Sequence, residues 1–190
     1  MNLPNKLTVI RVILIPVFLA LFFMESLRGH YLWALVVFAA ASLTDMLDGY
    51  LARKYNWVTD FGKLMDPLAD KLLVMAAMVS LISVNLVHAV PVILILAREF
   101  LVTAIRQIAA QKGVVLAADN WGKIKTVCQM FWLCFGLLWL QLSAMPVPFP
   151  AIVFQAVYYA YFALMIASLF FTVVSGLNYC IKNRHLFADM

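Results

Sequence analysis

Residues 45–70 read DMLDGYLARKYNWVTDFGKLMDPLAD and contain five aspartates, four of which, Asp45 with Asp48 and Asp66 with Asp70, form pairs three and four residues apart. The whole chain has only nine acidic residues. On insertion scales an aspartate inside a membrane segment costs about 2.5 to 3.5 kcal/mol. Four such residues need compensation that the apolar sequence around them does not offer. Two divalent cations would match their charge.

The overall composition is that of a polytopic membrane protein. Of the 190 residues, 66% are hydrophobic and 12% are charged, and the mean hydropathy is +0.97. These values exclude an ordinary soluble domain. The net charge of +5 fits a membrane surface better than a nucleic acid, because the basic residues are scattered at segment ends.

Apolar windows long enough to cross a bilayer as helices occur six times. They cover residues 7–25, 31–53, 63–85, 88–110, 123–143 and 151–178. We therefore expect an all-α fold, with residues 1–190 forming a single membrane domain of six packed transmembrane helices. Residues 2–6 contain a proline and polar side chains, so we expect a short interfacial segment there before the first span.

The basic residues predict the orientation of these spans. Six spans place both termini on one side of the membrane. All Lys and Arg residues except Arg28 group with the termini or with the turns around residues 54–62 and 111–122. By the positive-inside rule these regions are cytoplasmic. We thus expect a multi-pass protein of the cell membrane whose aspartates open to the cytoplasm.

The four aspartates form two pairs, each on one helix face. Asp45 and Asp48 are three residues apart near the end of the second span, and Asp66 and Asp70 are four apart at the start of the third. If these helices run antiparallel, the four carboxylates face one another. Hard divalent cations prefer oxygen ligands, and two adjacent ions stabilise both attacking and leaving oxygens in phosphoryl displacement. The pattern predicts a site for two ions of Mg²⁺ or Mn²⁺.

A nucleotide pocket is predicted beside this metal site. Gly49 and Gly62 have no side chain where a base or phosphate would approach the backbone, and Arg53 supplies a forked cation. Taken singly, such glycines are more often packing residues of membrane helices. The joint pattern, which also includes Ala52, favours a binding site.

Together these positions reproduce the signature of the CDP-alcohol phosphotransferase family, D-x-x-D-G-x-x-A-R, eight residues, then G-x-x-x-D-x-x-x-D. The resemblance implies a six-helix membrane fold, usually a homodimer, in which an alcohol hydroxyl attacks the β-phosphorus of a CDP-linked lipid and releases CMP. It also implies that the four aspartates surround two Mg²⁺ or Mn²⁺ ions and that Asp70 is the general base. The positions that match the CDP site are Asp48, Gly49, Arg53, Gly62 and Asp66.

Outside the signature, the chain resembles the bacterial phosphatidylglycerophosphate synthases of this family. The resemblance rests on residues 2–5 with Thr8 and Arg11, on residues 97–106 and on residues 121–126. It implies CDP-diacylglycerol as donor and glycerol 3-phosphate as acceptor.

A doubly charged acceptor phosphate requires cations in the cytoplasmic half of the bundle. The candidates there are Arg98, Arg106, Lys123 and Lys125. The alternative for each is snorkelling to lipid headgroups. Thr8 and Arg11, at the cytoplasmic end of the first span, are candidates for contacting the diphosphate, with simple anchoring as the alternative.

Two other functions stay open. The same chemistry could use inositol phosphate, serine or phosphatidylglycerol as acceptor, although neutral or zwitterionic acceptors have less use for four cations. A divalent-cation transporter would also carry aspartates in its spans. Against a transporter, all four aspartates lie in the cytoplasmic half, and ion transport does not explain Gly49 and Arg53 at these spacings.

Overall fold

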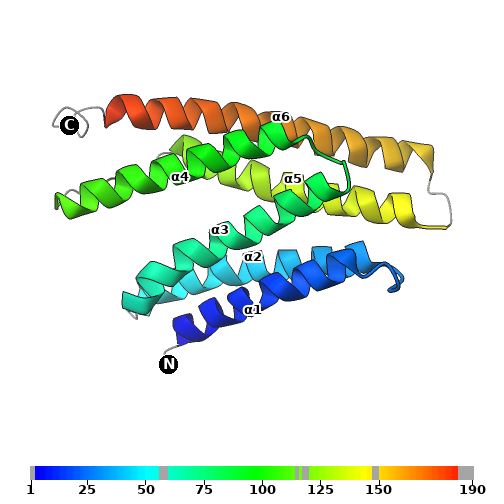
Figure 1. The fold of residues 1–190 in the computed structure, drawn as a ribbon, viewed down its shortest axis with the longest axis horizontal. Coiled ribbons are helices and arrows are strands. Elements are labelled where there is room, and N and C mark those ends of the chain that lie inside the picture. The colour runs from blue at the N-terminus through cyan, green and yellow to red at the C-terminus, as the bar shows by residue number, and fades with distance from the viewer. Residues whose placement is uncertain (1–2, 56–59, 114–115, 117–119, 147–149, 184–190) are drawn as a thin grey trace.

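The structure, a computed structural model, contains six α-helices in the part of the chain that it describes (Figure 1). It describes the backbone of residues 3–55, 60–113, 116, 120–146 and 150–183, with side chains except in 3–7, 45–55 and 60–67. The helices are α1 (Leu3–Phe23), α2 (His30–Tyr55), α3 (Asp60–Ser83), α4 (Ala89–Gln111), α5 (Asn120–Ala144) and α6 (Ala151–Lys182).

These helices coincide with the six apolar windows. Each helix end lies within about four residues of the predicted end, as expected when long apolar runs stop at polar or turn-forming residues. The described backbone contains no strand, which confirms the all-α prediction for that part of the chain. One detail differs: α1 already begins at Leu3, so the described part of the predicted interfacial segment is the first turn of α1. Pro4 fits there because first-turn N–H groups have no partner within the helix.

Helices α5 and α6 are, among the described residues, the two that are long and apolar enough to cross a membrane. They have 25 and 32 residues. Large apolar side chains point outward along α6, including Ile152, Phe170 and Leu177. Such an exposed apolar surface suits lipid better than water.

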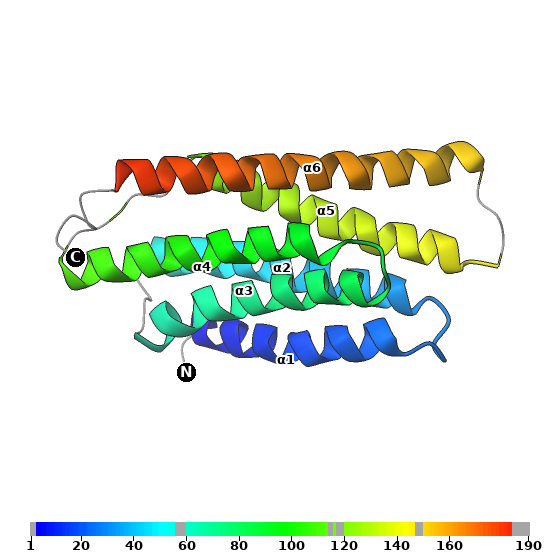
Figure 2. The same cartoon turned by 45° about the horizontal axis from the view of Figure 1, so that its top comes forward.

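The helices pack as two groups that share one core. Helix α1 contacts α2 and α3, α5 contacts α2 and α6, and α4 runs along α6 (Figures 1 and 2). Large buried side chains of the shared core come from all six helices: Phe18, Phe22, Phe38, Leu73, Met78, Leu81, Ile95, Trp132, Leu133 and Tyr161. A smaller cluster joins α4 to α6 through Val102, Ile105, Ala109 and Tyr179.

Helix α5 approaches both α3 and α6 closely at Gly136. A Cβ atom at this position would lie 3.1 Å from Leu81 Cδ1 and 3.1 Å from the Tyr161 ring. Small residues allow helix backbones to come this near. The Tyr161 hydroxyl also donates a hydrogen bond to the Leu86 carbonyl at 3.0 Å, which ties α6 to the α3–α4 connection.

The α1–α2 and α3–α4 connections lie at one end of the bundle (Figure 1). Near that end the Leu32 N–H donates to Gln141 Oε1 at 2.9 Å, which links α2 to α5. The first turn of α1 and the last turn of α6 lie at the opposite end, together with the end of α2 and the start of α3 (Figure 1). The signature residues therefore lie toward the end that also holds the first turn of α1 and the last turn of α6.

Replacing Gly136 by valine is expected to destabilise the protein, because the branched side chain would overlap Leu81 and Tyr161. Overpacking of this kind costs about 1–3 kcal/mol. Thermal unfolding of the purified protein in detergent should therefore shift to lower temperature. The control is Ala163→Val on the exposed face of α6, which should unfold like the unmodified protein. Equal shifts for the two variants would contradict the close packing at Gly136.

Candidate active site

The eight signature residues lie on α2 and α3, consecutive helices that contact each other. Asp45 is ten residues before the end of α2, and Asp70 is ten residues after the start of α3. At 1.5 Å per residue, both lie about 15 Å from the α2–α3 connection along their helices. Asp48 and Asp66 lie seven and six residues from these helix ends. The backbone thus places one aspartate from each helix at each of two similar levels.

Of these eight residues, Asp70 is the one whose side chain the structure describes. The seven that lie outside the described side chains are Asp45, Asp48, Gly49, Ala52, Arg53, Gly62 and Asp66. Where side chains are described, no group of three or more His, Cys, Asp or Glu residues is arranged to hold a metal ion. The two-ion cluster and the CDP contacts therefore stay predictions.

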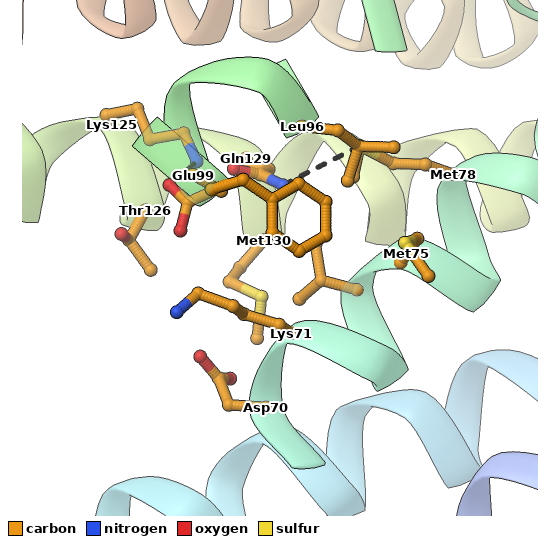
Figure 3. A pocket seen from close by; sticks show the side chains of 12 residues that line it. Asp70, Lys71, Met75, Met78, Leu96, Glu99, Lys125, Thr126, Gln129 and Met130 are labelled. Carbon is orange, nitrogen blue, oxygen red and sulfur yellow. Dashed lines mark hydrogen bonds and ion pairs between the residues drawn. The ribbon is translucent and has the colours of Figure 1, made fainter. Parts of the chain in front are cut away.

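Asp70 lines a pocket between α3, α4 and α5 (Figure 3). The pocket contains about 470 Å³ of empty space, counting the part that is open to the surroundings. Its polar lining is Asp70, Lys71, Glu99, Lys125, Thr126 and Gln129, and its apolar lining is Val74, Met75, Met78, Leu96, Phe100 and Met130. Figure 3 shows the charged groups gathered on one side and Met75, Met78 and Leu96 on the other. A pocket divided in this way suits a ligand that has both a charged and an apolar part.

Glu99 joins two cations on the polar side of the pocket. Its Oε1 accepts hydrogen bonds from Lys125 Nζ at 2.7 Å and from Arg98 Nη1 at 3.0 Å. The side chains of Lys125, Arg98 and Glu99 are 2%, 13% and 24% exposed. Because buried charges are less costly when they are paired and hydrogen-bonded, these contacts offset part of the cost of placing the three groups inside the bundle.

Lys71 adds a third cation next to Asp70. Its Nζ donates to Thr103 Oγ1 at 2.6 Å, and the Thr103 hydroxyl donates to the Glu99 backbone carbonyl at 2.8 Å. Figure 3 shows the Lys71 ammonium on the same side of the pocket as the Asp70 carboxylate and Glu99. Helices α3, α4 and α5 therefore each bring one charged residue or more to the same opening.

Arg98 lies against two glycines from neighbouring helices. A Cβ atom on Gly122 of α5 would be 3.2 Å from Arg98 Nη2, and one on Gly176 of α6 would be 3.1 Å from Arg98 Cγ. These glycines leave the space that the arginine occupies. Arg98 Nε is buried and has no hydrogen-bond partner among the described groups. Since buried N–H groups are rarely left without an acceptor, Arg98 is a candidate for binding a ligand oxygen.

The four predicted acceptor-binding cations have different surroundings. Lys125 lines the pocket and Arg98 shares Glu99 with it. Arg106 instead donates from Nε to the Tyr179 hydroxyl at 3.1 Å, and its guanidinium carbon lies 5.6 Å from the centre of that ring. The Lys123 side chain is exposed. Of these four residues, Lys125 alone lines the pocket around Asp70, and the role of all four in binding phosphate stays a prediction.

Thr8 and Arg11 are buried in the bundle, at 1% and 0% exposure. They lie on α1, which packs against both α2 and α3. A fully buried arginine does not reach the lipid headgroups, so burial disfavours simple anchoring. Their contact with the diphosphate stays a prediction.

Several polar residues of this region carry no role in the sequence interpretation, namely Lys71, Thr103 and Gln129. The signal that could have found them is helical spacing. Glu99 and Thr103 are four residues apart on α4, and Lys125 and Gln129 are four apart on α5. Residues at this spacing share a helix face, and polar groups that share a face in an apolar span usually point into the bundle.

A family model described as CDP-alcohol phosphatidyltransferase matches residues 1–174. The chain belongs to the CDP-alcohol phosphatidyltransferase family. It is therefore a membrane-associated transferase of phospholipid biosynthesis, which confirms the resemblance inferred from the aspartate signature.

Individual CDP-alcohol phosphatidyltransferases resemble the chain over most of its length. A Bacillus subtilis protein named CDP-diacylglycerol–glycerol-3-phosphate 3-phosphatidyltransferase is 44% identical over 193 aligned residues, covering 96% of this chain and 95% of that protein. A Rickettsia typhi protein with the same name is 47% identical over 137 residues, covering 72% and 76%. A Mycobacterium tuberculosis protein named probable phosphatidylglycerophosphate synthase is 38% identical over 183 residues, covering 94% and 79%.

Replacing Lys125 by methionine should destabilise this phosphatidyltransferase, because Glu99 loses its shortest ion pair. Removing one partner of a fully buried pair costs about 3–5 kcal/mol. The cost should be smaller here because Glu99 is 24% exposed and keeps Arg98. Thermal unfolding in detergent should occur several degrees lower.

The matched control is Lys123→Met, a change of the same type two residues away on an exposed side chain. It should leave the unfolding temperature unchanged. If the two substitutions had equal effects, the Lys125–Glu99 pair would not be what stabilises this region.

Proposed function

We propose that this chain transfers the phosphatidyl group of CDP-diacylglycerol to the hydroxyl of glycerol 3-phosphate, giving phosphatidylglycerophosphate and CMP. The observation that carries the proposal is that Asp70 shares one pocket with Lys71 and Lys125. A carboxylate that can accept a proton thus lies beside cations that can bind a phosphate. The printed names of the relatives from Bacillus subtilis and Rickettsia typhi support the choice of donor and acceptor.

The reaction is a direct displacement at the β-phosphorus of the donor. The acceptor hydroxyl oxygen forms a bond to this phosphorus while the bond to the bridging oxygen of CMP breaks, and CMP leaves with that electron pair. Asp70 accepts the hydroxyl proton. Lys71, Lys125 and Arg98 hold the acceptor phosphate so that its hydroxyl faces Asp70. Positioning of this kind supplies much of the rate enhancement in phosphoryl transfer.

The carboxylates of the four signature aspartates are suitable ligands for a divalent cation. Members of this family generally depend on one, and carboxylate oxygens are the ligands that Mg²⁺ and Mn²⁺ prefer. Asp45, Asp48, Asp66 and Asp70 would hold two such ions, and their pairing at two levels of α2 and α3 supports this. When bound, the ions neutralise charge on the phosphoryl oxygens and on the departing CMP.

The cytidine nucleotide would lie beside the aspartates. Gly49 and Gly62 would let it approach the two helices, and Arg53 would bind its phosphates together with Thr8 and Arg11. The burial of Thr8 and Arg11 on α1, next to α2 and α3, supports this placement.

All six helices would span the cell membrane, with the termini and the active site facing the cytoplasm. The helices have 21 to 32 residues, and about 20 residues suffice to cross a bilayer core. The first turn of α1 and the last turn of α6 lie at the same end of the bundle (Figure 1). This arrangement and the distribution of Lys and Arg support the orientation. A homodimer would follow from the family resemblance.

A panel of acceptors tests the substrate. Purified protein with CDP-diacylglycerol and Mg²⁺ or Mn²⁺ should release CMP with glycerol 3-phosphate, because Lys71 and Lys125 share the pocket of Asp70 and can bind its doubly charged phosphate. Serine and phosphatidylglycerol should give little CMP, and inositol phosphate is the most stringent competitor because it carries the same charge. Faster release with any of these three than with glycerol 3-phosphate would reassign the acceptor.

The substitution Asp70→Asn tests the proposed base. An asparagine of the same size cannot accept the hydroxyl proton, so CMP release should fall by about 100-fold or more. Asp60→Asn, on the same helix but outside the signature, should retain activity. If the Asp70 variant formed product at the normal rate, another group would have to be the base.

A further inference from the structure

We propose that Glu99 is a positioning residue for the acceptor phosphate, which holds Lys125 and Arg98 in place before glycerol 3-phosphate binds. This inference rests on the proposed function, because it assigns Glu99 to the same reaction. Glu99 itself is not proposed to touch the reacting atoms.

The geometry around Glu99 supports this role. One oxygen, Oε1, accepts both Lys125 Nζ at 2.7 Å and Arg98 Nη1 at 3.0 Å. The two cationic nitrogens are therefore less than 6 Å apart. Two positive charges at this distance repel strongly inside a bundle where water is scarce. Without the shared carboxylate the two cations would move apart, and Lys125 would turn away from the pocket that it lines.

Lys125 depends on Glu99 because it is almost fully buried. Its side chain is 2% exposed, and it arises from α5 while Glu99 arises from α4. A buried ammonium with no anion beside it carries a large desolvation penalty. Glu99 supplies that anion while the pocket is empty, so the lysine is already in place when a phosphate arrives.

The local charge balance suits a phosphate monoester. Lys71, Arg98 and Lys125 carry three positive charges, and Glu99 carries one negative charge. With Asp70, which also lines the pocket, these groups still carry a net positive charge of one, so the region favours an anionic phosphate. Lys71 belongs to the same network because Thr103 links it to the Glu99 backbone carbonyl.

A role limited to stability explains this arrangement less well. An apolar pair of similar volume is often as stable as a buried ion pair, so stability alone does not require charges at these positions. Glu99 also lines the pocket itself and is 24% exposed. Charged groups that open into a pocket of a membrane bundle generally serve a ligand.

The test is Glu99→Gln, which keeps the size of the side chain and removes its charge. CMP release is measured with the full-length protein in detergent and lipid, with glycerol 3-phosphate varied at saturating CDP-diacylglycerol and then the reverse. The KM for glycerol 3-phosphate should rise about tenfold, equivalent to about 1.4 kcal/mol of lost binding. The KM for CDP-diacylglycerol should change by less than about twofold, because Glu99 acts only on the acceptor side.

A second measurement separates positioning from general damage to the fold. Glycerol lacks the phosphate, so the preference for glycerol 3-phosphate over glycerol should fall in Glu99→Gln. Glu99→Asp keeps the charge on a shorter side chain and should recover part of this preference. Glu25→Gln, on an exposed residue of the α1–α2 connection, should match the unmodified protein in every measurement.

The possible outcomes distinguish a failure of the role proposed for Glu99 from a failure of the proposed function. If the unmodified protein releases no CMP with glycerol 3-phosphate, the proposed function fails. If it is active and Glu99→Gln leaves the KM for glycerol 3-phosphate unchanged, or raises both KM values equally, the role of Glu99 is overturned. Should Glu99→Gln not fold, Glu99→Asp decides: a selective rise in the KM for glycerol 3-phosphate supports the inference, and an unchanged KM overturns it.

Discussion

A charge inside this bundle is stable only beside an opposite charge, and that constraint shapes the region around Glu99. Removing an ion from water costs several kcal/mol even after the protein relaxes. Lys125 is 2% exposed and would be unfavourable without the carboxylate 2.7 Å away. Asp70, Lys71, Glu99 and Lys125 therefore gather around one pocket, while the buried cluster of the shared core is apolar.

The same constraint applies to the aspartates of α2 and α3, with the signs reversed. There the sequence places the four signature carboxylates within residues 45–70, and Arg53 and the nearby lysines are too few to neutralise them and also bind a diphosphate. Divalent cations can neutralise the remaining negative charge of the aspartates, because carboxylate oxygens are ligands that these ions prefer. Asp70 is the residue where the two regions meet, because it belongs to the signature and also lines the pocket with Lys71 and Lys125. An anionic acceptor and a metal-bound donor would thus meet at its carboxylate.

How far the sequence predicts this protein depends on the range of the interaction concerned. Helix positions follow from long apolar runs, which are local, so all six were predictable to within a few residues. The aspartate signature is also local, and it identified the family. Contacts between helices were harder to predict from the sequence, because they depend on how each helix is rotated about its axis. Arg106 and Lys125 look alike in the sequence, yet one pairs with Tyr179 and the other with Glu99. Helical spacing identifies a shared face on one helix but not its partner on another.

The packing of Arg98 against Gly176 ties two distant positions of the chain together. A Cβ atom at position 176 would lie 3.1 Å from Arg98 Cγ, near the root of the side chain, where rotation of the guanidinium gives no relief. The arginine on α4 therefore fits in this position only when residue 176 on α6 has no side chain. The two positions should therefore vary together among relatives. A relative that has alanine or serine at position 176 should also have a smaller basic side chain, or one that is placed differently, at position 98. Acceptor preference within the family could therefore change through a residue that never meets the substrate.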